Sequence, residues 1–407
     1  MQDAWSLALQ GNHRLRASRW RVSAAQHHVG AARSARFPDI DLEAAYALRS
    51  DQRAFVAQNP GLAGLGSTLV IPYQQQDDVS LRALASVPLF TGGRIQNGIA
   101  AAESGVEARR LGRAQLEQEM KMTVAESFIG VLRAQRARQV AQATQRSLSA
   151  HFQDVNLSFS QGMVPRTDLL AAQVALSNAR QRSLAADRQL QGAWAIYNRQ
   201  LVRDLETIVP LQELHPDMVH LDLHQLTDRA RRQRAEISTP LWEAEALEHR
   251  AVSLRRTGWP QLSLQGGYAY QENRFQQPQD VAEIGVGLQW NPYDGGRRRH
   301  EAEALLLQAK GLRELSAANE RRAALEVRLA WLDIQETRQR VLVTQEIVQQ
   351  AEENLRAARQ RFTAGTGTNT EALDAEAART QSLHDYYDAT YAVVLASLRL
   401  RRATHDL

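Results

Sequence analysis

Few residues in this sequence have the types and spacing that chemistry requires. The chain contains no cysteine, which excludes disulfide bonds and thiolate chemistry. It also lacks a Gly-x-Ser-x-Gly elbow, a His-Glu-x-x-His zinc motif and a Gly-Lys-Ser/Thr phosphate loop. The glycine-rich stretch 61–66 has no strand–turn–helix context, so an exposed loop is favoured over a phosphate cradle. We therefore predict no enzyme, no catalytic residue and no cofactor.

Two groups of polar residues are the remaining candidates for a site. His215, His220 and His224 lie in an irregular stretch, where a solvated surface is favoured over a metal site. Glu371 and Asp374 are three residues apart at the start of the last predicted helix, so they share one face. These carboxylates either only stabilise the N-terminus of their own helix through its dipole, or form a charged functional surface.

The segments that position these carboxylates occur twice in the chain. Residues 88–94 read Pro-Leu-Phe-Thr-Gly-Gly-Arg, and residues 291–297 read Asn-Pro-Tyr-Asp-Gly-Gly-Arg. The two junctions are formed by Gly92, Gly93, Arg94 and by Gly295, Gly296, Arg297. Each junction precedes a matched turn signal, made of Phe159, Gly162, Val164, Pro165 in one copy and Phe362, Gly365, Thr366, Gly367 in the other. Gly93 to Gly162 and Gly296 to Gly365 are both 69 positions, which indicates duplication of one unit.

The duplication predicts two structural repeats joined by a linker. The first repeat, 1–202, comprises a helix (3–36), a β-hairpin (39–88) with a flexible loop at about 49–78, a long helix (94–160) and a helix (166–202). Residues 203–228 contain two prolines and form a linker or equatorial segment. The second repeat, 229–407, comprises a helix to about 257, a β-hairpin (261–291), a long helix (297–362) and a helix (370–402).

The predicted helices and strands are unusual in length and pattern. A helix over 94–160 would be a rod of about 100 Å, which is typical of coiled coils or helical barrels. Each strand alternates apolar and polar residues over about 10 positions, the length that a membrane-spanning β-strand needs. Four such strands cannot close a barrel, and lipid does not tolerate an open sheet edge. Either the sheet packs on something in water, or several chains share one barrel.

Composition excludes other classes of protein. The formal charge is +4, with 49 basic and 45 acidic residues that alternate along the helices, which favours solvated helix faces over a nucleic-acid surface. No apolar run reaches the roughly 18–20 residues of a transmembrane helix. Met1–Trp20 has no apolar leader segment, so either the protein stays in the cytoplasm or a signal peptide, with any lipid-bearing cysteine, has been removed.

Over residues 3–405 the chain resembles the TolC family of outer membrane efflux proteins. The resemblance rests on the two strand–Gly-Gly-Arg–helix junctions, the two Phe-x-x-Gly turns and their duplicated order. It implies a mainly α fold in which three chains form a shared 12-stranded β-barrel, four strands each, in the outer membrane of a Gram-negative cell. An α-helical barrel would continue into the periplasm. The homotrimer would be the exit duct of a tripartite efflux pump or type I secretion system.

The resemblance also assigns partners and site residues. A periplasmic adaptor protein would dock on the two turns, and an inner-membrane transporter of RND, ABC or MFS type would supply energy. Glu371 and Asp374 would line the periplasmic aperture as two stacked rings of carboxylates. Asp168 matches Glu371 in the first repeat, but Ala171 replaces the partner of Asp374. The stretch 366–370 is uncharged, so we expect the local clasp to come from elsewhere.

One alternative function remains open from the sequence. A soluble periplasmic coiled-coil scaffold or adaptor would explain the long helices. It would leave the two alternating hairpins unexplained, and an adaptor should have one helical hairpin rather than two copies.

Overall fold

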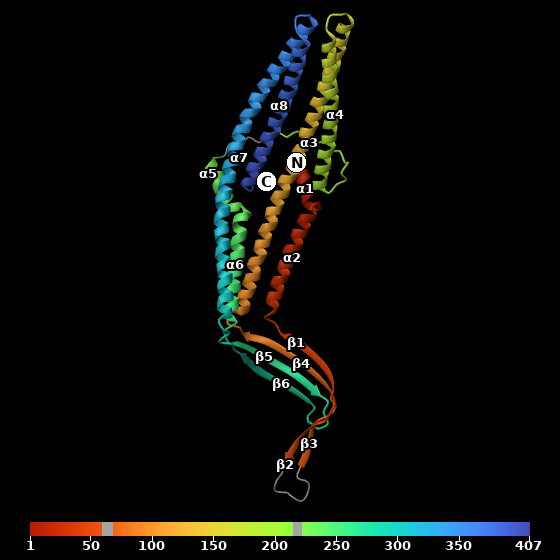
Figure 1. Cartoon of the computed structure of the whole chain (residues 1–407). Coiled ribbons are helices and arrows are strands. Elements are labelled where there is room, and N and C mark those ends of the chain that lie inside the picture. The colour runs from red at the N-terminus through yellow and green to blue at the C-terminus, as the bar shows by residue number, and fades with distance from the viewer. Residues whose placement is uncertain (59–67, 215–221) are drawn as a thin grey trace. The chain divides into compact units, whose positions relative to one another are not determined.

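The computed structural model describes residues 1–58, 68–214 and 222–407, which form eight helices and six strands within these ranges (Figure 1). The first half contains α1 (Gln2–Gly11), α2 (His13–Ser34), β1 (Asp39–Leu48), β2 (Arg53–Gln58), β3 (Thr68–Gln74), β4 (Asp77–Phe90), α3 (Arg94–Ser160) and α4 (Arg166–Leu201). The second half contains α5 (Leu223–Gln233), α6 (Ala235–Arg256), β5 (Gln261–Gln271), β6 (Asp280–Gln289), α7 (Arg297–Thr363) and α8 (Asn369–Ala403). The predicted mainly α fold with a four-stranded sheet is confirmed.

One of the two long helices, α7, is built on small residues at heptad spacing. In α7 the residues at every seventh position from 302 to 344 are all buried, namely Ala302, Ala309, Ser316, Ala323, Ala330, Thr337 and Thr344. A strict seven-residue repeat keeps one seam of a helix against its neighbour, and small side chains let the two backbones approach closely. The 67-residue helix α7 therefore packs against its neighbours along a narrow row of small side chains, without a thick hydrophobic core.

Contacts group the residues into two compact units, and each unit takes matching segments from both repeats. The helical unit comprises residues 1–21, 110–239 and 315–407. Its main core joins α1, α3, α4 and α8 around Phe128, Trp194, Tyr197 and Tyr391. The sheet unit comprises residues 22–109 and 240–314 and contains all six described strands.

Four predicted elements are wrong in detail. The expected helix 3–36 is two helices, because Asn12 has an extended backbone and its Oδ1 accepts a hydrogen bond from the Arg14 amide at 2.8 Å. The expected loop 49–78 includes β2 and β3, which pair with each other as a separate two-stranded sheet. The last residues of the expected linker 203–228 belong to α5. The helix expected up to residue 257 is interrupted at Arg234, whose extended backbone separates α5 from α6.

Candidate functional site

The four-stranded sheet has one apolar face that no described residue of the sheet unit covers. The strand order is β1-β4-β5-β6, and all three pairings are antiparallel. Register aligns the apolar positions across the sheet, as in the row Ile40–Ala85–Gly266–Ile284. Ile40 and Ile284 are 67% and 80% exposed, although they are large aliphatic residues. A contiguous exposed apolar face of this kind marks contact with another protein or with a membrane.

The opposite face of the sheet is polar and acidic. Asp41 and Glu283 lie in one row across the sheet, with Leu84 and Gly267 between them. Asp39, Glu43, Arg82, Ser86 and Gln265 have the same parity and share this face. The polar face therefore suits contact with water, and the apolar face suits a non-aqueous environment.

Aromatic residues mark both ends of the apolar face. A register shift between Pro88 and Phe90 places Phe90 beside Leu262, so that Phe90 joins the apolar row at the end of the sheet next to the helices. Tyr46 and Tyr268 lie toward the other end and are also exposed. Transmembrane β-strands carry aromatic girdles at the two ends of their apolar band.

The two predicted strand–helix junctions are sharp turns that require glycine. Gly92, Gly93, Gly295 and Gly296 all have positive φ, from 59° to 89°. At Gly92 a Cβ atom would also lie 2.9 Å from the Trp259 Cβ, so the junction tolerates no side chain. Arg94 Nε donates to Gln261 Oε1 at 3.3 Å, and Arg297 forms an ion pair with Glu301 at 3.5 Å.

The two predicted turns close the α3–α4 and α7–α8 hairpins. Gly162 and Gly365 have φ of 74° and 70°, the left-handed conformation that commonly ends a helix. Phe362 is buried against Val155 and Ala172 of the other hairpin, with Val164 packed beside them. Residues around the α3–α4 turn differ, because Leu157, Met163 and Leu170 have exposed side chains. Pro165, Thr366 and Gly367 lie within the turns, outside the helices.

The structure places the three predicted aperture residues near the starts of α4 and α8. Glu371 forms an ion pair with Arg361 at 3.4 Å, and both side chains remain largely exposed. Asp374 is exposed and has no side-chain partner within the described ranges. Asp168 contributes its backbone carbonyl, which accepts a hydrogen bond from Asn369 Nδ2 at 3.1 Å. The lining of an aperture by these residues stays a prediction.

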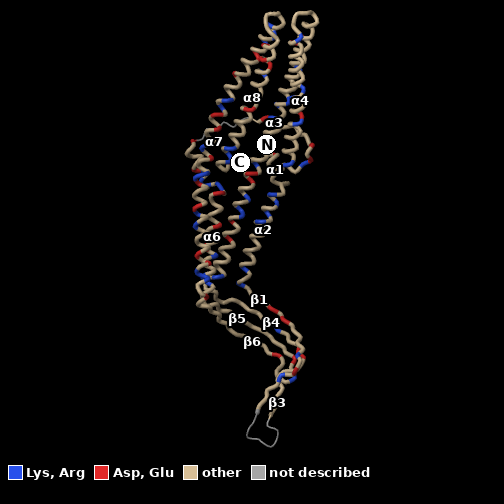
Figure 2. The backbone as a smooth tube through the Cα atoms, in the orientation of Figure 1, with Lys and Arg blue, Asp and Glu red and all other residues tan. Residues whose placement is uncertain are grey.

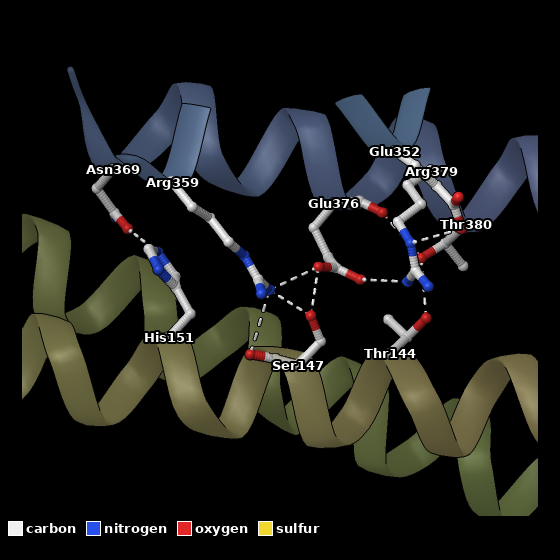
Figure 3. A network of polar contacts seen from close by, with 9 residues as sticks. All are labelled: Thr144, Ser147, His151, Glu352, Arg359, Asn369, Glu376, Arg379 and Thr380. Carbon is white, nitrogen blue, oxygen red and sulfur yellow. Dashed lines mark hydrogen bonds and ion pairs between the residues drawn. The ribbon is translucent and has the colours of Figure 1, made fainter. Parts of the chain in front are cut away.

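A buried ionic network joins α3, α7 and α8 inside the helical unit (Figure 3). At its centre the Glu376 side chain is only 2% exposed. Arg359 donates to Glu376 Oε2 at 2.7 Å, and Ser147 Oγ donates to the same oxygen at 2.5 Å. Arg379 approaches Glu376 Oε1 at 3.5 Å and Glu352 at 3.7 Å. Two arginines therefore balance two carboxylates, as a buried charge requires.

Neutral side chains extend this network along the same three helices. Thr144 and Thr380 share a hydrogen bond of 2.9 Å. Nearer the turns, His151 Nε2 lies 2.8 Å from Asn369 Oδ1 (Figure 3). Asn369 Nδ2 also donates to the backbone carbonyl of Asp168. The uncharged stretch 366–370 thus contributes Asn369 to contacts within the chain, and the expectation that the clasp at the aperture comes from elsewhere stays a prediction. A neutral amide at Asn369 connects α8 to both α3 and α4.

Sequence reasoning missed this network, although two signals were present. Glu376 lies on the same face as the buried Ala372 and Thr380, where a carboxylate is out of place unless it is paired. His151 lies seven residues after Thr144 and four before Val155, in the buried seam of α3. Both signals indicate a buried polar group, but neither identifies its partner more than 200 residues away.

The remaining sequence candidates receive no assignment from the structure. The stretch 61–66, His215 and His220 lie outside the described residues. His224 is exposed at the start of α5 and lies 3.2 Å from Asp228. Across the described ranges, no cluster of three His, Asp or Glu side chains has the arrangement of a metal site.

Among the described residues, no helix contains an apolar segment long enough to cross a lipid bilayer.

Comparison with known proteins identifies the family. The family model for outer membrane efflux proteins matches residues 4–196 and 226–404, which is most of the chain. No curated protein matches the chain in sequence. Neither the family match nor the structural neighbours support the alternative of a soluble scaffold or adaptor.

Solved structures share the fold at low sequence identity. CusC, whose structures concern transmembrane channel formation, has a TM-score of 0.84 and 18% identity over 99% of this chain and 91% of its own. The outer membrane protein VceC of Vibrio cholerae has a TM-score of 0.82 and 17% identity over 99% and 95%. The MtrE outer membrane channel of Neisseria gonorrhoeae, in its open state, has a TM-score of 0.78 and 17% identity over 99% and 88%. The chain thus belongs to the outer membrane efflux protein family, which confirms the resemblance drawn from its sequence.

Proposed function

We propose that three copies of this chain form one outer membrane channel, the exit duct of a tripartite efflux pump or type I secretion system in a Gram-negative cell. The sheet carries this proposal, because it has an exposed apolar face, a polar face and two free edges, β1 and β6. An open edge is not tolerated in lipid, so the edges must pair with those of other copies. Three copies of a four-stranded sheet supply twelve strands.

The dimensions of the sheet support this placement. A ten-residue strand such as β6 is about 34 Å long, and a tilt of about 40° reduces its span to roughly 25 Å. That is the height of the apolar band of a transmembrane barrel. The apolar face would contact lipid, and the polar face with Asp41 and Glu283 would line the water-filled interior. The β2–β3 hairpin, inserted between β1 and β4 at the ends away from the helices, would face the exterior.

The helices support assembly through an apolar surface on α7. Leu307, Leu315, Leu325, Leu329 and Leu332 are between 45% and 57% exposed. This row lies away from the buried small-residue seam of the same helix. A neighbouring copy would cover it, and the helices of three copies would form a barrel in the periplasm.

The turns are the proposed docking site for a periplasmic adaptor protein, which connects the channel to an inner-membrane transporter of RND, ABC or MFS type. The exposed Leu157, Met163 and Leu170 around the α3–α4 turn support an apolar contact there. Glu371 and Asp374 are the proposed aperture. Three copies would bring six carboxylates together, and Arg361 compensates only Glu371 within a chain. Such rings favour cations.

Crosslinking tests the shared barrel, because the chain has no native cysteine. Asp41→Cys in β1 and Glu283→Cys in β6 lie on the polar face, three strand spacings or about 14 Å apart within one chain. A short bis-maleimide reagent cannot span that distance, so it should link neighbouring copies. The double variant, inserted in membranes, should give linked dimers and trimers, and each single variant should stay monomeric on the gel. Monomers alone from the double variant would contradict the shared barrel.

Conductance tests the aperture separately. In planar bilayers, Glu371→Ala/Asp374→Ala should lower cation preference relative to the wild-type channel. Glu353→Ala, an exposed carboxylate of α7 that pairs with Arg356, is the control. Equal conductance and equal cation preference in all three proteins would remove the aperture assignment without affecting the barrel.

A further inference from the structure

The junction between α6, the sheet and α7 carries a cluster of tryptophan and arginine. The Arg256 guanidinium lies 4.2 Å from the ring centre of Trp259, in a cation–π contact. Trp290 Nε1 donates to the carbonyl of Gly258 at 3.0 Å, which brings the second indole to the same place. Trp259 and Trp290 are nevertheless 48% and 58% exposed. Two fixed, half-exposed indoles thus lie beside a guanidinium.

This junction has an excess of positive charge. Residues 255–259 and 294–303 contain five arginines and three carboxylates. Two of the carboxylates, Glu301 and Glu303, pair with Arg297 and Arg255. Arg298 is held by Asp294 at 2.8 Å and by the carbonyl of Asn291, so it serves the fold of the junction. Arg299 is exposed and has no side-chain partner within the described ranges. Figure 2 shows basic residues gathered where α6 and α7 meet the sheet. Arg256 and Arg299 therefore retain positive charge that no carboxylate of the junction neutralises.

The first repeat has the same arrangement at the start of β1. Arg33 and Phe37 precede Pro38 as Arg255 and Trp259 precede Pro260, at the same offset of 222 positions. Phe37 is 67% exposed, and the side chain of Arg36 has no partner within the described ranges. An aromatic residue with neighbouring arginines thus occurs at both places where a helix leads into the sheet.

We propose that these junctions, chiefly Arg256, Trp259, Trp290 and Arg299, bind the headgroups of anionic phospholipids in the membrane leaflet nearer the helices. The proposal rests on the proposed placement of the sheet in a membrane. Trp290 continues the alternation of Ile284, Val286 and Leu288, so the cluster is continuous with the apolar face. Indoles prefer the headgroup level of a bilayer, because their rings are amphipathic. Guanidinium groups bind phosphate through paired hydrogen bonds.

The site would select lipids by the net charge of the headgroup. Phosphatidylcholine and phosphatidylglycerol both carry a phosphate, but the cationic choline of phosphatidylcholine neutralises its phosphate, whereas phosphatidylglycerol has a net negative charge. Each arginine near an anionic lipid surface strengthens binding roughly fivefold. Two arginines without a carboxylate partner should therefore favour phosphatidylglycerol over phosphatidylcholine by about 25-fold.

Native mass spectrometry of the detergent-purified protein tests the inference, with dioleoyl phosphatidylglycerol and dioleoyl phosphatidylcholine titrated in separate arms. Wild-type protein should bind phosphatidylglycerol more tightly, and Arg256→Gln/Arg299→Gln should lose about 25-fold in affinity for it. Arg180→Gln/Arg182→Gln makes the same charge change on exposed residues of α4 and should retain wild-type binding. Equal binding of the two lipids by wild-type protein, or equal losses in both double variants, would overturn the inference.

Two further measurements keep the result unambiguous. Brominated phosphatidylglycerol should quench wild-type tryptophan fluorescence, and Trp259→Phe/Trp290→Phe should remove most of that quenching; unchanged quenching would place the lipid elsewhere. Insertion and conductance of each variant in phosphatidylcholine bilayers separate the two proposals. Wild-type protein that inserts and conducts but has no lipid preference contradicts only the lipid site, and failure of wild-type protein to insert contradicts the membrane placement itself.

Discussion

Removing the Glu376 carboxylate should loosen the start of α8. In the structure this group is 2% exposed and accepts hydrogen bonds from Arg359 at 2.7 Å and Ser147 at 2.5 Å. Breaking a buried ion pair by deleting one partner costs about 3–5 kcal/mol. Arg359 is 37% exposed and regains part of its hydration once released, so Glu376→Ala should cost about 2–3 kcal/mol.

Hydrogen exchange is the suitable assay, because the proposed trimer in a membrane would not unfold in two states. Loss of about 2 kcal/mol of local stability should speed exchange of amides 369–380 roughly thirtyfold. Glu376→Gln keeps the shape of the side chain and should fall between wild type and Glu376→Ala. The matched control is Glu353→Ala, because the Glu353–Arg356 pair is about 62% exposed on both sides and is screened by water.

Similar exchange rates for Glu376→Ala and Glu353→Ala would refute this reasoning. That result would mean that the apolar seam alone holds α8 against α3, and that the buried carboxylate is tolerated rather than required. A change spread evenly over α3, α4, α7 and α8 would also contradict it, because the network acts only where its members meet.

Three other perturbations test separate parts of the structure. Leu288→Arg on the apolar face should reduce membrane insertion by about 2–4 kcal/mol, whereas Gln265→Arg on the polar face should insert normally. Gly92→Ala must place a Cβ 2.9 Å from another Cβ at a φ of 59°, so hydrogen exchange of the amides around residue 92 should show a local loss of about 2–4 kcal/mol. Gly105→Ala, in open helix, should instead gain about 0.5–1 kcal/mol of local stability. Burial, with Arg234 and Lys121 nearby, holds the pKa of His405 below its ordinary 6.5, despite opposing effects of Glu236 and Asp406. The stability that the neutral His405 contributes should therefore be complete above pH 6.5 and be lost as pH falls through the lowered folded pKa. Between pH 7.5 and 5, the melting temperature of wild type should therefore fall further than that of His405→Asn. Asparagine is the chosen replacement because it tolerates the φ of 65° at this position.

Local patterns in the sequence predicted most of the fold. Glycine pairs fix the junctions, because positive φ at Gly92 and Gly296 excludes other residues. The alternation of apolar and polar residues determines which face of each strand is apolar. The pairing register then follows, because the apolar faces of neighbouring strands must lie on the same side of the sheet. Long proline-free runs rich in helix formers predicted α3 and α7 to within one residue at each end.

The parts that failed depend on information that is not local. The β2–β3 hairpin lies in a stretch broken by glycine and proline, and its apolar residues, such as Leu69, Val70 and Ile71, run consecutively instead of alternating. The break at Asn12 comes from one side chain bonding to a nearby amide, which competes with continuation of the helix. The Glu376 network requires three helices to meet, so no window of the sequence contains both the carboxylate and Ser147.

The two free edges of the sheet have a consequence for biogenesis. A newly folded copy offers bare N–H and C=O groups on β1 and β6 beside an apolar face, which is the template on which strands aggregate. If the copies share one barrel, as proposed, folding of this region and association of the copies would be a single event, with a yield that depends steeply on the local concentration of chains. Until its neighbours arrive, each copy would need these strands shielded from other chains.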